Sequence, residues 1–115
     1  MRYLLMICAN EVSEAAASHE DTTAMMAGYA TFAEEMNARN VLRDGNRLRP
    51  ISDATTVRVR NSEILSTDGP FAETKEQMGG YYIVDVADLD EAIAVAAKIP
   101  SAQFGSIEIR PIWED

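Results

Sequence analysis

An uninterrupted apolar run near the start of the chain, Tyr3–Ala9, is the feature that most constrains the fold. The run follows Arg2 and is broken by Asn10 and Glu11, so it has the length of a strand and is too short to span a bilayer. No small-residue cleavage pattern of a secretory signal follows it. A strand of this kind must be covered, which predicts a central strand with at least one face packed against another layer.

A long helix is predicted next. Ser18 and Asp21 have the spacing of a capping box, and Met25, Tyr29, Phe32 and Met36 then recur at helical spacing, which predicts one inner stripe. We expect a helix from about Glu20 to Arg39. The methionines Met25, Met26 and Met36 have two interpretations, an adaptable apolar pocket or ordinary core packing, and we assign them to the core.

Two hairpins are predicted in the middle of the chain. Asp44-Gly45 is a favoured hairpin dipeptide, and Pro50 limits further strand pairing after it. Residues 54–67 then alternate valine with arginine, turn at Asn61-Ser62 and return through Ile64 and Leu65. The second pattern is typical of a strand, a tight turn and an antiparallel strand.

The last third of the chain predicts a strand, a helix and a strand. Residues 80–87, "GYYIVDVA", are rich in aromatic and β-branched side chains. Asp88 and Glu91 repeat the capping spacing, and Pro100 ends the helix that follows. Residues 106–113, "SIEIRPIW", form the final strand, with Ile107 and Ile109 on its buried side.

This order of elements predicts an α+β fold, a ferredoxin-like split βαβ sandwich with an added hairpin, in one domain over residues 1–115. Helices in a single layer leave the other face of the sheet in water. A second copy of the chain is the simplest cover for that face, so we expect a homodimer.

Composition excludes several classes of function. The net charge of −9 repels phosphate backbones and anionic lipid surfaces, so we expect no nucleic-acid or membrane partner. Cys8 is the only cysteine and lies in the apolar run, where we expect it to be buried. A disulfide within the chain is therefore impossible, and a cytoplasmic location suits the protein. We expect no metal site and no cofactor, because no metal-ligand spacing or glycine-rich phosphate loop is present.

The stretch "TDGPFAETKEQMGGYY", residues 67–82, does not have the composition of ordinary scaffold. Asp68, Gly69 and Pro70 predict a turn, and we expect Phe71 to insert into the core. Residues 72–78 contain good helix formers and predict one or two helical turns. The pair Gly79-Gly80 then allows the backbone to change direction, so we expect the stretch to hold one conformation and to form one wall of a cleft.

In its wider context, "TTVRVRNSEILSTDGPFAETKEQMGGYYIVDVADLDEA" over residues 55–92 resembles the YCII-related family, in particular its DGPF-domain subgroup. The similarity extends to "YLLMI" at the start and "EIRPIW" at the end. It implies a dimeric α+β barrel of ferredoxin-like subunits, in a superfamily that includes small monooxygenases and lactone isomerases. Similar proteins are often encoded beside extracytoplasmic-function sigma factors. A better-studied branch uses a His-Asp pair, but the one histidine here, His19, lies where DGPF-type sequences often carry proline.

Two residues are candidates for acid-base catalysis. Asp68 has the position of a general base at a strand end, or of a turn residue that bonds local amides, and we favour the turn. His19 is the one histidine and so the one candidate for a histidine proton shuttle, although its position beside Glu20 and Asp21 at a helix start favours an exposed side chain.

A wider set of residues is proposed to bind a ligand. Arg58 and Arg60 share one strand face that suits an anion, or they simply mark a half-exposed strand, which we favour. Glu73 and Lys75 suit a polar ligand, but charged residues in such a segment are usually solvated. The candidate ligand-binding residues are Tyr3, Arg58, Phe71, Glu73, Lys75 and Tyr81.

Two hypotheses of function follow. In the first, a small dimer binds a small organic molecule in a cleft between sheet and helices, with cofactor-free acid-base chemistry centred on Asp68 and Tyr3. In the second, the protein is a non-catalytic accessory or regulatory protein that acts through protein contacts. The sequence leaves open whether any turnover occurs, and a pocket of ligand size would favour the first hypothesis.

Overall fold

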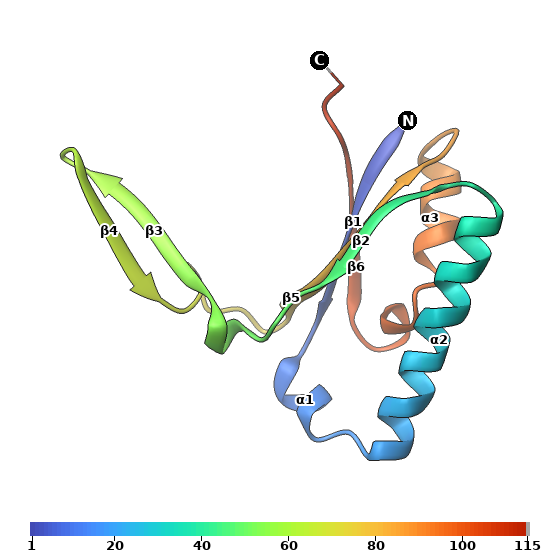
Figure 1. Cartoon of the computed structure of the whole chain (residues 1–115), viewed down its shortest axis with the longest axis horizontal. Coiled ribbons are helices and arrows are strands. Elements are labelled where there is room, and N and C mark those ends of the chain that lie inside the picture. The colour runs from blue at the N-terminus through green and yellow to red at the C-terminus, as the bar shows by residue number, and fades with distance from the viewer. Residues whose placement is uncertain (115) are drawn as a thin grey trace.

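The computed structural model describes residues 1–114, which form a four-stranded antiparallel sheet, two helices on one face of it and a separate hairpin (Figure 1). In chain order the elements are β1 (Arg2–Ala9), α1 (Glu11–Ala15), α2 (His19–Ala38), β2 (Leu42–Arg47), a 3₁₀ turn η1 (Ile51–Asp53), β3 (Thr55–Arg60), β4 (Glu63–Asp68), β5 (Gln77–Asp85), α3 (Leu89–Ala96), a 3₁₀ turn η2 (Pro100–Gln103) and β6 (Ser106–Pro111).

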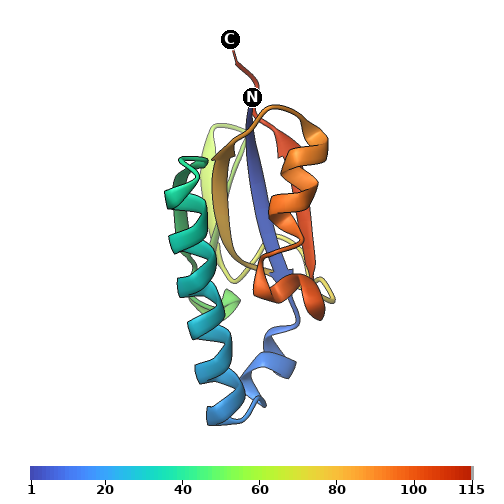
Figure 2. The same cartoon turned by 90° about the vertical axis from the view of Figure 1, so that its right-hand side faces the viewer.

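The sheet has the strand order β2-β5-β1-β6, with every neighbouring pair antiparallel. Strands β1 and β2 are joined by α2 and run parallel to each other, and β5 lies between them. This is the split βαβ arrangement, so the expected ferredoxin-like fold with an added hairpin is confirmed. Figure 2 shows α2 and α3 side by side in front of the sheet.

Local capping begins both long helices where the sequence predicts. The Ser18 Oγ accepts a hydrogen bond from the Asp21 amide at 3.0 Å. At α3, Asp88 Oδ1 accepts from the Glu91 amide at 2.9 Å, and Glu91 Oε2 accepts from the Ala87 amide at 2.8 Å. These bonds satisfy amides that have no partner inside the helix, which explains why the predicted starts agree with the structure.

The core lies between the sheet and its two helices. Alternate residues of β1, among them Tyr3, Leu5 and Ile7, point toward the helices and are buried. Phe32 and Met36 of α2 pack against them, and the Phe32 and Tyr82 rings lie 4.9 Å apart. The opposite face of the sheet carries half-buried Leu4 and other side chains, including Met6, Cys8, Tyr81 and Ile83. Cys8 was expected to be buried, but it lies on this uncovered face, which we call the open face.

The hairpin β3–β4 projects away from the sheet as an arm (Figure 1). Its turn at Asn61-Ser62 has positive φ at both residues, as predicted for a tight hairpin. The arm gives the chain a radius of gyration of 16.1 Å, against roughly 13 Å for a compact chain of this length. Val57 and Ile64 on the arm are 60% and 77% exposed.

Three further local predictions are wrong. Asp44-Gly45 forms no hairpin but lies within β2, directly after a bulge at Arg43, where the register with β5 shifts between Leu42 and Asp44. Phe71 is 80% exposed instead of buried, because the arm carries its segment away from the core. Residues 72–76 form no helix, and strand β5 begins at Gln77.

Candidate ligand-binding site

A cavity of about 320 Å³ lies between the N-terminal half of α2 and the sheet, near the β2–β5 edge. Its size falls within the usual range for pockets that bind small molecules. We call it the α2 pocket. It is lined by Ile7, Glu14, Ala17, Thr22, Met25, Met26, Tyr29, Gly45, Asn46, Arg47, Gly79, Gly80, Tyr81, Tyr82 and Ser101.

The pocket exists because only the C-terminal half of α2 packs closely on the sheet. Phe32 and Met36 are buried, whereas Met25 is half-buried and Met26 is 49% exposed. The assignment of all three methionines to the core is therefore correct for Met36 alone. Met25 and Met26 instead form an apolar wall of the pocket, a role that suits their flexible side chains.

Glycines keep the strand side of the pocket open. Gly45 lies opposite Tyr82 in the sheet, and a Cβ on Gly45 would lie 2.5 Å from the Tyr82 Cδ1 atom. Gly80 is the partner of Arg47, and a Cβ there would lie 3.0 Å from the carbonyl oxygen of Asn46. Larger residues at either position would displace neighbours that shape the pocket.

Two hydroxyl groups that line the pocket form a hydrogen bond with each other. The Tyr29 Oη and Ser101 Oγ atoms are 2.6 Å apart and share a hydrogen bond, and Ser101 is 2% exposed. Burial raises the pKa of Tyr29, and the carboxylate of Glu14 adds to this effect, while the Ser101 hydrogen bond and Arg47 oppose it. Burial also raises the pKa of Tyr82. Both phenols are therefore neutral at physiological pH, so they act as polar contacts rather than as bases.

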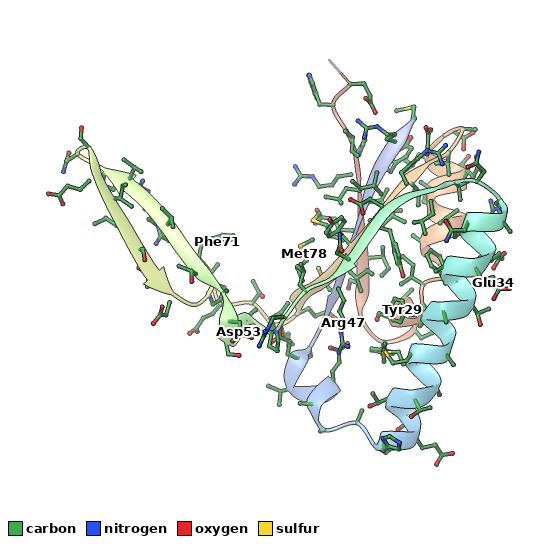
Figure 3. The ribbon with its side chains drawn as sticks, viewed as in Figure 1. Tyr29, Glu34, Arg47, Asp53, Phe71 and Met78 are labelled. Atoms are coloured by element: carbon green, nitrogen blue, oxygen red, sulfur yellow. The ribbon has the colours of Figure 1, made fainter. Side chains whose placement is uncertain are left out.

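Two opposite charges border the pocket. Arg47 extends from the end of β2 into the space between sheet and α2 where Tyr29 also lies (Figure 3). Glu14 comes from α1, and no ion pair joins the two side chains among residues 1–114. Both are exposed. The pocket thus combines an apolar interior with a separate cation and anion.

Helix α1 is held in place by the segment that precedes and begins β5. Asn10 caps α1 through a 2.9 Å bond from the Ser13 amide, and its Nδ2 donates to the Lys75 carbonyl oxygen at 3.0 Å. The Glu11 amide donates to Gln77 Oε1 at 2.9 Å. These bonds fix α1, and Glu14 with it, relative to the sheet.

The predicted catalytic residues do not line the pocket. Asp68 ends β4 opposite Thr55, at the base of the arm, and its carboxylate makes no hydrogen bond within residues 1–114. The turn beside it is held by the main chain, since the Gly69 amide donates to the Ala54 carbonyl oxygen at 2.7 Å and Gly69 has a φ of 95°. His19 is the exposed first residue of α2.

The predicted ligand-binding residues are scattered. Only Tyr81 lines the α2 pocket, but its side chain lies on the open face, where its hydroxyl accepts a 2.8 Å bond from Asn46 Nδ2. Tyr3 is buried in the core. Arg58 lies on the arm, and the remaining three, Phe71, Glu73 and Lys75, are exposed in the segment between β4 and β5. The glycine end of that segment, Gly79-Gly80, does form part of the pocket wall.

Sequence reasoning overlooked Glu14, Tyr29, Arg47 and Ser101 as site residues. For Tyr29 a signal was available, because helical spacing predicted that its side chain lies on the inner stripe of its helix and faces the sheet. No local pattern singled out Arg47, because its position depends on its pairing with Gly80 across the sheet.

Comparisons with known proteins place the chain in a family. A profile of the YCII-related domain matches residues 1–114. The chain belongs to the YCII-related family. The expected family is thus confirmed, while the DGPF subgroup remains a prediction. An uncharacterized protein of Rhizobium meliloti (strain 1021) is 36% identical to this YCII-related protein over 110 residues, which cover 93% of this chain and 89% of the relative.

Within the part of the chain that the structure describes, no helix combines the length and apolar character needed to cross a membrane. Among the same residues, no group of three or more His, Cys, Asp or Glu side chains is arranged to hold a metal ion.

Proposed function

We propose that this YCII-related protein binds a small organic molecule in the α2 pocket. The observation that carries the proposal is the pocket itself, a cavity of about 320 Å³ that is mainly apolar and has a few polar groups at defined positions. Such a combination is typical of small-molecule sites, in which apolar contacts give affinity and polar groups fix orientation.

The lining residues offer a ligand two kinds of contact, apolar and charged. Ile7, Met25 and Met26 provide apolar contact, and Arg47 and Glu14 offer charges near the opening. Glu14 is the one carboxylate on the wall within residues 1–114, so cofactor-free proton transfer in this pocket would use Glu14 as its base rather than Asp68.

A thermal-shift screen against a metabolite library tests the proposal, with two matched variants of α2. Thr22 and Thr23 are adjacent and exposed, but only Thr22 lines the pocket. We expect hits to raise the unfolding midpoint of the wild type and of Thr23→Trp, because a ligand bound by the native state stabilises it. In Thr22→Trp the indole should occupy the pocket and remove the shift. Hits that shift both variants equally would place binding elsewhere.

We also propose that the protein is a homodimer in which the open face and the arm contact a second copy. The open face carries Leu4, Met6 and Ile83 without a covering layer, and the arm exposes Val57, Val59 and Ile64. A protruding two-stranded hairpin has little stability by itself, and exposed apolar groups of this extent favour association. A second copy is the occupant that would cover both surfaces at once through a two-fold axis.

A further inference from the structure

Arg47 differs from the other cationic side chains of the protein in its surroundings. The chain has ten lysines and arginines against nineteen acidic residues. Six of the ten form ion pairs with carboxylates: Arg2, Arg39, Arg43, Arg49, Lys98 and Arg110. Of the other four, Arg58 and Arg60 lie on the arm and Lys75 precedes β5. Arg47 alone lines the α2 pocket, and it has no carboxylate partner within residues 1–114.

The backbone fixes the direction of Arg47. In the sheet, Arg47 pairs with Gly80, and Gly80 pairs with Ile7, whose side chain points toward the helices. The next amide, that of Leu48, donates to the Gly79 carbonyl oxygen at 2.9 Å, so the ladder continues past Arg47. Arg47 therefore projects on the helix side of the sheet, as Figure 3 shows, and its partner on the neighbouring strand, Gly80, has no Cβ.

The remaining polar side chains that line the pocket are neutral hydroxyl or amide groups or carry the opposite charge. The Tyr29 and Ser101 hydroxyl groups bond each other, and the Asn46 and Tyr81 side chains bond each other on the open face. Glu14 would repel a second anionic group near the opening. Around these groups the wall is apolar, with Ile7, Met25, Met26 and Tyr82.

We propose that the α2 pocket selects an organic monocarboxylate with an apolar or aromatic body, held by a bidentate contact between its carboxylate and the Arg47 guanidinium. The inference rests on the proposed function, since it names the class of ligand for the same pocket. A planar guanidinium matches a carboxylate with two parallel hydrogen bonds, and the apolar walls accept the rest of the molecule. Glu14 disfavours dicarboxylates through like-charge repulsion.

Titration calorimetry with phenylacetate and its neutral analogue phenylacetamide tests this inference. Against the wild type, phenylacetate should bind at least about tenfold more tightly, as expected for a charge-assisted contact. Arg47→Gln should bind both probes equally, and Arg47→Lys, which keeps the charge without the planar fork, should retain part of the preference. Arg58→Gln is the matched control on the arm and should behave as the wild type. Because Arg47 is exposed, its variants should fold, which circular dichroism checks.

The outcomes separate this inference from the proposed function. Equal affinity of the two probes for the wild type, with binding lost in Thr22→Trp, would overturn the carboxylate preference and leave the pocket as the binding site. A preference that persists in Arg47→Gln would likewise overturn the role of Arg47. If neither probe binds at millimolar concentration, the inference fails for this class, while the metabolite screen still decides the proposed function.

Discussion

The Tyr29 and Ser101 hydroxyl groups are 2.6 Å apart and join α2 to the turn η2 at the inner side of the α2 pocket. Ser101 is almost fully buried, so its hydroxyl group depends on this one contact. The pair connects two segments that are far apart in the sequence and that both border the site.

Tyr29→Phe should lower the free energy of unfolding by about 1–2 kcal/mol, because it leaves the Ser101 hydroxyl buried without this partner. Ser101→Ala should cost less, since the half-buried Tyr29 hydroxyl can reach water. Urea denaturation of the two single variants and the double variant would give a coupling of about 1 kcal/mol. Strictly additive losses would mean that the hydrogen bond contributes nothing to stability.

Stability should decline at alkaline pH. Burial raises the pKa of Tyr29 and Tyr82 above 10.0, so the folded state holds protons that the unfolded state releases. This contribution is complete below pH 10 and is lost as pH rises through the folded-state pKa values. Cys8, whose pKa burial raises above 9.0, adds an earlier decline. Urea midpoints across this range should fall for the wild type and fall less steeply for Tyr29→Phe. A wild-type urea midpoint that increases as the pH is raised beyond 10 would contradict the predicted loss of stability.

Gly45→Ala should destabilise the protein by about 1–3 kcal/mol through overpacking. The added methyl group would lie 2.5 Å from the Tyr82 ring, which cannot move freely because it packs on Phe32. Gly79→Ala is the matched control, since a Cβ there has no atom within 4 Å, and it should change stability by less than about 0.5 kcal/mol. Thermal denaturation of both variants checks this. Equal midpoints would show that the Tyr82 ring moves aside for the added methyl group at little cost in stability.

Light scattering after size exclusion should give twice the monomer mass at micromolar concentration. Met6 lies near the middle of the open face, between Tyr81 and Glu108 on the neighbouring strands, so Met6→Glu should dissociate the dimer. Val12→Glu places the same charge on α1, where Val12 is 80% exposed, and should leave the mass unchanged. A wild-type protein of monomer mass would remove the proposed dimer and favour the hypothesis of an accessory protein that uses the open face for another partner.

Much of the fold could be predicted because its signals are local. The caps at Ser18 and Asp88 and the turn at Asn61-Ser62 are satisfied within three residues, so sequence spacing is sufficient to place them. The wrong predictions concern residues whose structure is decided by distant neighbours. Asp44-Gly45 has the composition of a turn, but the Tyr82 ring beside Gly45 explains the glycine. Phe71 has the character of a core residue, but its segment follows the arm.

The site was less predictable than the fold. Its wall includes Gly80, which the sequence singled out, but its charges come from α1 and from the end of β2. Helical spacing placed Met25 on the inner side of α2, yet it could not show that the helix packs closely only from Phe32 onward. Which inward residues border a cavity depends on how far the helix lies from the sheet, and periodicity does not encode that distance.

Methyl NMR of methionine-labelled protein tests ligand binding in the α2 pocket most directly. Five of the six methionines report on defined places: Met25 and Met26 line the pocket, Met36 is in the core, and Met6 and Met78 lie on or beside the open face. Titration with a hit from the metabolite screen should move the Met25 and Met26 signals in proportion to occupancy and leave Met36 and Met6 nearly unchanged. Shifts at Met6 and Met78 with Met25 and Met26 unchanged would contradict the account and place the ligand on the open face instead.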